Sequence, residues 1–393
     1  MRARPRLARA VMPCAVACFA ACVAAEAMRY SALPAPGSQL QVDLQGQPGG
    51  TPAAAQPVPR LRLNTSTLIP AAANAPSAHA STLAVLPNGE LLVYWWAGAR
   101  ESAPDVAIYA ARWHDGRWSP ARRVLTREQL GVQLGFGVRR LGNPAVWVAG
   151  DGRIHLYVVA TGLGGWAASR VVQLVSSDGG ERFSAVRVLP LSPLLNTSVL
   201  VRTPPVGLTD GGWLLPAYFE LGHKFPLVVA FSADGALSWT RRIGRSITSL
   251  QPTLLPVSAT ELHALMRDHG AQRRVQQAVS IDAGKSWRDL PAFELVNHDN
   301  SVAALRLTEG GYVLAHNDTL APPATPRQWL RLSTSADAAR WTAAPDVQRG
   351  AQGEEFSYPS AVQIGRQLHV TYTAQRAAIG HAVFDILAAS DTP

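Results

Sequence analysis

Three segments of the chain repeat one eight-residue pattern, Ser-x-Asp-x-Gly-x-x-aromatic. They span residues 176–183, 232–239 and 280–287, and Ala236 occupies the glycine position of the second segment. Ser and Asp side chains can hydrogen-bond the backbone of a tight turn, glycine tolerates a positive φ, and the aromatic ring anchors the strand that follows. A turn motif that recurs at a regular interval indicates a repeat architecture.

Two weaker copies extend this series, one on each side. Residues 113–118 precede the three segments and residues 335–341 follow them. The aromatic anchors of the five copies are separated by 48 to 65 residues, and they are Trp118, Phe183, Trp239, Trp287 and Trp341. This interval is about the length of one four-stranded propeller blade. Residues 61–388 have room for six such units, so the sequence predicts an all-β fold, a six-bladed β-propeller.

Short β-rich runs lie between the anchors and end at Asn-Gly, Asp-Gly or Gly-Gly turns, as strands do. Several of them, such as 153–161 and 227–232, are apolar almost throughout, which is typical of strands covered on both faces. After the N-terminus no stretch longer than about ten residues has a helical period. The last unit, 356–387, contains only three evident strands. We expect residues 62–69 to supply the fourth and close the ring.

The first 27 residues have the features of an export signal. Four arginines precede an apolar run, residues 10–25, which ends at an Ala-Glu-Ala cleavage pattern. A cleaved signal peptide, an uncleaved membrane anchor and a lipidated Cys22 are the alternatives for this segment. Residues 28–60 are rich in Pro, Ala, Gly and Gln, which predicts a flexible linker. The protein is therefore expected to be exported, and to be periplasmic, membrane-anchored or secreted.

The composition excludes several classes of function. The net charge is +9, but the basic residues include only two lysines, and the arginines are spread along the chain rather than clustered as in a nucleic-acid site. All three cysteines lie in the leader, so the exported domain has neither disulfides nor thiolate metal sites. The ten histidines show no metal-ligand spacing, and no nucleotide-binding motif is present. We expect a monomer that needs no cofactor and binds no nucleic acid.

The repeated pattern is the sequence form of the Asp-box, and from about residue 79 to residue 381 the chain resembles the sialidase superfamily, in its branch with BNR-type repeats. Sialidases hold the carboxylate of an acidic sugar with three arginines, because planar guanidinium groups match carboxylate geometry. A tyrosine assisted by a glutamate is the nucleophile and an aspartate is the acid/base. The resemblance implies an exo-glycosidase that releases sialic acid or a similar terminal acidic sugar from a glycan.

Five residues of this chain match site residues of that family. Arg267 ends an apolar strand of the fourth blade and Arg327 precedes the strand that leads to the last Asp-box; they match two of the three arginines. Tyr358, near the start of the last blade, matches the nucleophile. Arg100 and Asp105 follow the second strand of the first blade, where a supporting arginine and the acid/base are expected.

Three positions depart from the family pattern. His79 stands in place of the first arginine, Gln251 in place of the glutamate that activates the tyrosine, and Thr373 in place of the glutamate that orients the first arginine. The resemblance therefore implies a retuned site in which His79 and Gln251 face the substrate.

A substitute base could come from Glu220, Glu354 or Glu355, or from His79 itself. Of these we expect Glu220 to be the catalytic group. We also expect the carboxylates of Asp105 and Glu220 to balance the charge of the clustered arginines.

Two other functions agree with the same departures. One is a carbohydrate-binding propeller that keeps the cleft without turnover, and the other is a hydrolase or lyase acting on a uronic-acid polysaccharide. Each candidate residue also has a structural interpretation, as an ion pair for the arginines and as core packing for Tyr358 and His79. Four asparagines near the expected inner strands could bind sugar hydroxyls or form turns, namely Asn143, Asn196, Asn300 and Asn317.

Overall fold

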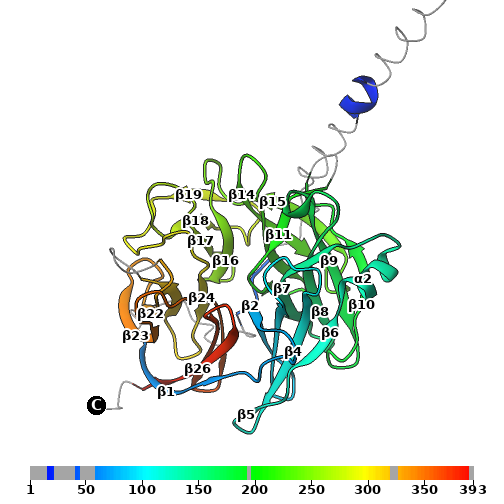
Figure 1. Cartoon of the computed structure of the whole chain (residues 1–393). Coiled ribbons are helices and arrows are strands. Elements are labelled where there is room, and N and C mark those ends of the chain that lie inside the picture. Colours follow the sequence, from blue (N-terminus) through cyan, green and yellow to red (C-terminus); the bar gives the residue numbers. More distant parts are fainter. Residues whose placement is uncertain (1–15, 22–39, 45–57, 193–195, 319–325, 389–393) are drawn as a thin grey trace, which may run out of the picture.

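The computed structural model describes residues 16–21, 40–44, 58–192, 196–318 and 326–388. Within these ranges the strands form six antiparallel sheets arranged around a common axis (Figure 1). Each sheet begins with a strand at the centre and proceeds outward along the chain, as the contacts between the first strands of neighbouring sheets show. The predicted six-bladed β-propeller is confirmed.

The blades follow one another in chain order. The innermost strands are β2 (Ser77–Val85), β7 (Arg140–Val148), β11 (Val199–Val201) with β12 (Val206–Gly207), β16 (Leu250–Pro256), β20 (Ala303–Arg306) and β24 (Phe356–Ile364). The second strands are β3 (Leu91–Gly98), β8 (Ile154–Thr161), β13 (Trp213–Phe219), β17 (Leu262–Arg267), β21 (Tyr312–Asn317) and β25 (Gln367–Ala374). The third strands are β4 (Ala107–His114), β9 (Ser169–Ser176), β14 (Phe225–Phe231), β18 (Gln276–Ser280), β22 (Trp329–Ser335) and β26 (Ala378–Leu387). The outer strands are β5 (Arg117–Trp118) with β6 (Arg122–Leu125), β10 (Ser184–Val188), β15 (Leu237–Arg242), β19 (Arg288–Leu290), β23 (Thr342–Arg349) and β1 (Arg60–Leu68).

The ring is closed by the strand that comes first in the sequence. β1 pairs with β26 in antiparallel register from Arg60 opposite Leu387 to Leu68 opposite Gly380 (Figure 1). The last blade therefore takes its outer strand from the N-terminal side, as expected for residues 62–69. This pairing covers the edge that β26 would otherwise expose.

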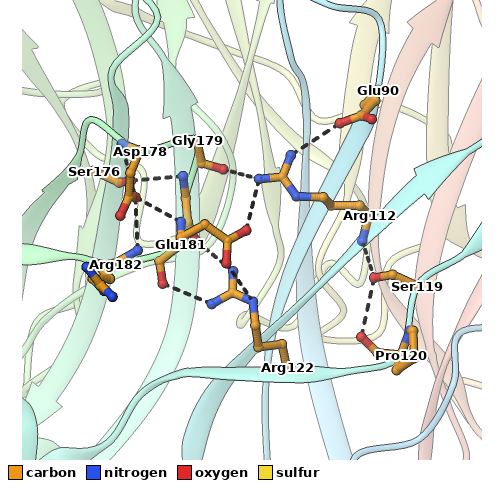
Figure 2. Close-up of polar contacts among 11 residues, drawn as sticks. Glu90, Arg112, Ser119, Pro120, Arg122, Ser176, Asp178, Gly179, Glu181 and Arg182 are labelled. Carbon is orange, nitrogen blue, oxygen red and sulfur yellow. Dashed lines mark hydrogen bonds and ion pairs between the residues drawn. The ribbon is translucent and has the colours of Figure 1, made fainter.

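The Asp-boxes are turns between the third and outer strands, and their side chains bond the turn backbone. In the second blade the Ser176 hydroxyl accepts a hydrogen bond from the Gly180 amide at 2.8 Å and donates to Asp178 at 2.7 Å. Figure 2 shows that Arg112 and Arg122 of the first blade reach across to this turn. Arg122 donates to the carbonyl of Gly180 at 2.9 Å, so the box also ties neighbouring blades together.

Four innermost strands carry a β-bulge close to their first residues. The register shifts between residues 79 and 82 in β2, 141 and 144 in β7, 250 and 253 in β16, and 357 and 360 in β24. In three of these bulges a non-glycine residue has a positive φ: Ala80 at 58°, Gln251 at 51° and Tyr358 at 54°. A bulge re-aims the side chains beside it, and bulges are frequent next to active sites. These bulges place His79, Gln251 and Tyr358 together.

Outside the strands, helix α2 (Arg127–Leu134), the 3-10 helix η1 (Gly165–Ala168) and residues 40–44 have defined structure. Helix α2 lies between the first two blades and has a capping box, in which Thr126 and Gln129 bond each other's backbone. Residues 40–44, within the predicted linker, lie against the third and fourth blades. There Val42 is buried and its amide donates to the Ala259 carbonyl at 2.7 Å.

Most of the predicted leader, residues 1–27, lies outside the described residues, and residues 16–21 form a short helix. None of the helices in the described part of the chain is long and apolar enough to cross a membrane.

Candidate active site

Tyr358 is the centre of a polar cluster at the bulged ends of the innermost strands. Its side chain is buried, and the whole residue is 9% exposed. The phenol oxygen accepts a hydrogen bond from Nη1 of Arg267 at 3.1 Å and one from Nε2 of Gln251 at 3.3 Å. Among the described residues the hydroxyl has no hydrogen bond with a carboxylate or an imidazole. Both of its partners are donors, and donors stabilise the phenolate over the phenol.

The two arginines expected to hold a carboxylate lie on either side of this tyrosine. Arg267 ends β17, and its Nε donates to Asp299 at 2.6 Å. The guanidinium carbon of Arg327 lies 5.3 Å from the centroid of the Tyr358 ring. The structure thus brings together three residues that are far apart in the sequence.

Arg327 is held by groups from two blades. Its Nε donates to Oδ1 of Asn300 at 2.7 Å and its Nη1 donates to Glu355 at 2.9 Å. Glu355 is one of the expected substitute bases, but its carboxylate accepts from Arg327, from Arg376 at 3.0 Å and from the Ser357 hydroxyl at 3.1 Å. These bonds and the nearby charges outweigh burial and lower the pKa of Glu355. Glu355 therefore orients arginines in this site.

His79 packs against the Tyr358 ring, with the two ring centroids 4.1 Å apart. Burial lowers the pKa of this imidazole well below its ordinary value, and the positive charges of Arg376, Arg327, Arg202 and Arg267 lower it further. A neutral imidazole offers no full positive charge to a carboxylate, so His79 does not replace the missing arginine by its charge.

Arg376 is a site residue that the sequence analysis missed. It lies in the turn after β25, where Nε donates to Glu355 and Nη1 donates to Glu101 at 2.6 Å. Its backbone carbonyl accepts from the amide of Ala78, beside His79. Arg376 thus supplies a third guanidinium beside His79, which occupies the position expected for the first arginine. The available signal was topological, because Arg267 and Arg376 both stand at the end of a second strand.

Arg202 was missed as well. It follows β11 in the third blade and is only 1% exposed, and its guanidinium carbon lies 5.2 Å from the centroid of the Tyr358 ring. An arginine directly after an apolar inner strand and before Thr-Pro-Pro was a visible but unspecific signal.

The remaining expected residues lie outside these contacts. Arg100 is exposed, and in the described part of the chain its side chain has no hydrogen bond or ion pair. The Asp105 carboxylate accepts from the Ala99 amide at 2.8 Å and lines a hollow of ≈ 350 Å³ beside α2. Glu220 lies 3.9 Å from Lys224, and Glu354 accepts from the amide of Ala351.

The carboxylates that balance the clustered arginines differ from those expected. They are Asp299, on Arg267, and Glu355, on Arg327 and Arg376, rather than Asp105 and Glu220. Asp299 directly precedes Asn300, and Glu355 lies three residues before Tyr358, whereas Asp105 and Glu220 follow the second strands of the first and third blades. The expectation was wrong because sequence order does not reveal which loops meet at the centre.

Several neutral residues fix the backbone around the cluster. The Thr373 hydroxyl accepts from the Ala80 amide at 3.1 Å and so holds the bulge of the first blade. Asn317 donates to the Phe356 carbonyl at 2.7 Å. Asn196 organises its own loop by bonding Leu189 and Leu191. Asn300 is thus a partner of an arginine, whereas Asn196 and Asn317 bond backbone groups.

The charges around Tyr358 change its acidity. Burial by itself raises the pKa of the phenol, but Arg267, Arg327, the hydrogen bond from Gln251 and Arg202 together bring it below its ordinary value. Tyr218 shows the contrast. It is also buried and bonded to Gln251, but burial dominates there, and the pKa of Tyr218 is raised. The site therefore makes the Tyr358 phenol more acidic than an ordinary tyrosine, and its ionised form can act as a nucleophile.

Comparisons with known proteins agree with this fold. The model of the BNR repeat-like domain family matches residues 89–370, and the chain belongs to this family. Together with the six blades, the match makes it a sialidase-like BNR-repeat protein. No curated protein sequence matches the chain significantly.

Several solved structures share the propeller. A protein of unknown function from Dyadobacter fermentans has a TM-score of 0.66 at 15% identity, over 83% of this chain and 99% of that one. A Hadza microbial sialidase has a TM-score of 0.65 at 15% identity, and the match covers 79% of this chain and 66% of the sialidase chain. The Trypanosoma rangeli sialidase, bound to the inhibitor DANA, has a TM-score of 0.63 at 16% identity, and the match covers 82% of this chain and 58% of the sialidase chain. This chain thus spans less than two thirds of either sialidase chain.

Proposed function

We propose that the protein is an exo-acting glycoside hydrolase of the sialidase type that releases a terminal acidic sugar from a glycan. The observation that carries this proposal is the Tyr358 phenol, which accepts hydrogen bonds from Arg267 and Gln251 and packs beside Arg327. A nucleophilic oxygen surrounded by guanidinium groups suits an anionic sugar, since the same charges attract the substrate carboxylate. We assign this carboxylate to Arg267, Arg327 and Arg376.

In the proposed reaction Tyr358 starts as the phenolate, and its oxygen bonds to the anomeric carbon while the bond from that carbon to the leaving oxygen breaks. Asp105, as the acid, gives its proton to that oxygen. Water then attacks the anomeric carbon, Asp105 takes a proton from the water, and Tyr358 leaves as the phenolate. Support for Asp105 comes from its loop, where Glu101 accepts a hydrogen bond from Arg376 at 2.6 Å.

The experiment is a panel of chromogenic acidic glycosides, sialosides and uronides, incubated with the wild type and Tyr358→Phe. We expect release of one acidic sugar by the wild type and at least a 10³-fold smaller kcat for the variant, because covalent catalysis is lost. Tyr372→Phe is the matched control. Its hydroxyl is in the same blade but bonds Gln348, at 2.8 Å. Equal rates for wild type and Tyr358→Phe would refute the nucleophile.

A second candidate is a carbohydrate-binding propeller without turnover. It is favoured by Gln251, which stands where a base is expected and donates to Tyr358 instead of accepting its proton. Saturable binding of an acidic glycan by both wild type and Tyr358→Phe, with no product from either, would establish this alternative and exclude the hydrolase.

A further inference from the structure

Arg202 is a buried cation that has no carboxylate partner among the described residues. Nη1 donates to the carbonyl of Ser81 at 3.1 Å, and Nη2 donates to the carbonyls of Tyr358 at 2.6 Å and Pro359 at 2.9 Å. Ser81 lies in the bulge of β2, and Tyr358 and Pro359 lie in the bulge of β24. One side chain from the third blade therefore joins the bulges of the first and last blades.

This arrangement needs an anion. Burial of an unpaired charge costs several kcal/mol even after the protein relaxes, and carbonyl dipoles compensate only part of that cost. Burial lowers the pKa of Arg202 only to about 10, so the guanidinium stays charged at neutral pH. A residue whose charge is retained at such a cost is expected to have a counter-ion nearby.

The carboxylates around the site are used by other arginines. Asp299 pairs with Arg267, and Glu355 pairs with both Arg327 and Arg376. Glu101 also binds Arg376. The acidic groups left near Arg202 are the phenols of Tyr218 and Tyr358. Burial raises the pKa of Tyr218, which keeps that phenol neutral, whereas the Tyr358 ring centroid lies 5.2 Å from the guanidinium carbon of Arg202 and the surrounding charges lower the pKa of Tyr358.

We propose that Arg202 is a positioning residue for Tyr358, and that it holds the bulge of the nucleophile and takes the Tyr358 phenolate as its counter-ion, so that the tyrosine is activated without a base. The proposal rests on the proposed function of this site. In this proposal Gln251 stabilises the phenolate by donating a hydrogen bond to its oxygen, whereas a carboxylate at the same position would repel the phenolate.

Other charged or titratable groups face Tyr358 from every element packed against it. They are His79 on β2, Tyr218 on β13, Arg267 on β17 and Arg327 before β22, with Asp299, Glu355 and Arg376 behind them. Arg267 and Arg327 also favour the phenolate, but each has its own carboxylate. Removing Arg202 therefore removes the one positive charge in this set that is not already neutralised.

The test is an ultraviolet titration of the full-length protein. The phenolate absorbance of Tyr358→Phe is subtracted from that of the wild type, which isolates one tyrosine among eight. We expect the wild-type difference to titrate below pH 10, the ordinary pKa of tyrosine. Arg202→Met, measured against the Arg202→Met/Tyr358→Phe double variant, should shift this titration upward by about 1 to 3 pH units, the usual effect of a neighbouring charge.

Two further variants sharpen the result. Arg306→Met is the matched control, because Arg306 is also buried and donates to a backbone carbonyl, that of Val257 at 2.7 Å, but it lies in β20. It should leave the titration unchanged. Gln251→Glu should raise the titration midpoint, because it adds a carboxylate beside the phenol oxygen. An Arg202→Met midpoint equal to that of the wild type would overturn the proposal.

If Arg202→Met does not fold, the wild-type titration can still overturn the proposal, because a midpoint at or above pH 10 excludes the phenolate counter-ion. Failure of the proposed function is a separate outcome. If no acidic glycoside is turned over but the titration shifts as described, the charge pairing stands and the hydrolase does not. If turnover is found and its pH profile is the same in wild type and Arg202→Lys, while the Arg202→Met titration does not move, only the role of Arg202 is refuted.

Discussion

At the scale of single residues, the carboxylate-binding role of Arg267 is open to a direct test. Arg267→Ala should weaken binding of an acidic sugar by about 30-fold or more, because a charged hydrogen-bonding partner of the ligand is lost in a largely desolvated site. The Arg267 side chain is 14% exposed and its partner Asp299 is 44% exposed, so unfolding should become easier by about 1–3 kcal/mol, between the usual costs of breaking an exposed and a buried ion pair. Calorimetric titration and thermal melting measure the two effects.

The control for this variant is Arg340→Ala, since the Arg340 side chain is 92% exposed and lies on an outer turn. It should bind the sugar like the wild type. If both variants keep wild-type affinity, Arg267 is a structural residue and the anion site is misplaced. Binding should also weaken as salt is added, because screening reduces the attraction between the arginines and the anion.

The site was only partly predictable from its residues. Tyr358, Arg267 and Arg327 could be named because the resemblance to the sialidase family assigns a role to their positions relative to the repeated turns. Gln251 and Tyr358 meet because both adopt a positive φ within a bulge, and nothing in a glutamine or a tyrosine signals that conformation. Arg202 reaches the site from another blade, so its contacts depend on the closed ring and not on its local sequence.

At the scale of elements, the Asp-boxes should differ in how much they stabilise the fold. In the fourth blade the Ser280 hydroxyl accepts from the Gly284 amide at 2.8 Å and donates to Asp282. The box of the fifth blade is one residue shorter. Among the described residues its Ser335 hydroxyl bonds Asp337 alone, donating to the carboxylate at 3.1 Å and accepting from the backbone amide at 3.2 Å. Ser280→Ala should thus cost about 1 kcal/mol more than Ser335→Ala, because it leaves a buried amide unpaired.

Denaturation with urea compares these two variants on an equal footing, since both replace a buried serine in the same type of turn. Equal losses of stability would mean that the bond to the glycine amide adds nothing.

The boxes were the part of the fold most visible in the sequence because their chemistry is local. The eight-residue helix α2 was not predicted, since it is shorter than the stretches that a helical period can identify.

The seam between the first and last blades contains a pair of buried histidines. The Trp118 indole donates to Nδ1 of His381 at 3.1 Å, and Nε2 of His381 lies 3.0 Å from Nδ1 of His369. This order requires neutral His381 with its proton on Nε2. Burial lowers the pKa of His381 to about 3, with a smaller effect of His369, and burial lowers that of His369 to about 4.

These shifts predict loss of stability in acid. The unfolded chain takes up the two protons near pH 6.5, whereas the folded chain resists them until about pH 4 and pH 3. Stability is thus complete above pH 6.5 and declines as the pH falls toward 4, by up to about 1.4 kcal/mol per pH unit for each histidine. His369→Gln should reduce this slope by one proton. Urea midpoints at pH 7, 6 and 5 provide the slopes.

At the scale of the whole molecule, the candidate site exists only while the ring is closed. His79 comes from the first blade, Arg202 from the third, Arg267 from the fourth, Arg327 from the fifth and Tyr358 from the last. The bonds from Arg202 to Ser81 and Tyr358 cross the seam between the first and last blades. Any opening of that seam separates Tyr358 from its neighbours, so binding of a ligand at this site should report on closure of the ring.

The strand that closes the ring can be removed without touching the site. We compare chains that begin at residues 40, 58 and 70. The step from 40 to 58 removes Val42, whose burial is worth about 1.5–3 kcal/mol, and should lower stability without changing ligand binding. The step from 58 to 70 removes β1 and the buried Ile69. β1 buries little of its own apolar surface beyond Leu61, but it pairs with β26 from Gly380 to Leu387.

That second step leaves β26 as a long unpaired edge, which is a template for pairing with another chain. We expect the chain beginning at residue 70 to self-associate, to melt at least ~5 °C lower than the chain beginning at 58, and to lose acidic-sugar binding because Tyr358 and Ser81 are no longer held across the seam. Size-exclusion chromatography, thermal melting and ligand titration follow the three effects. A monomer that begins at residue 70, melts like the longer chains and still binds the sugar would show that the ring closes without β1, and that the innermost strands alone hold the site together.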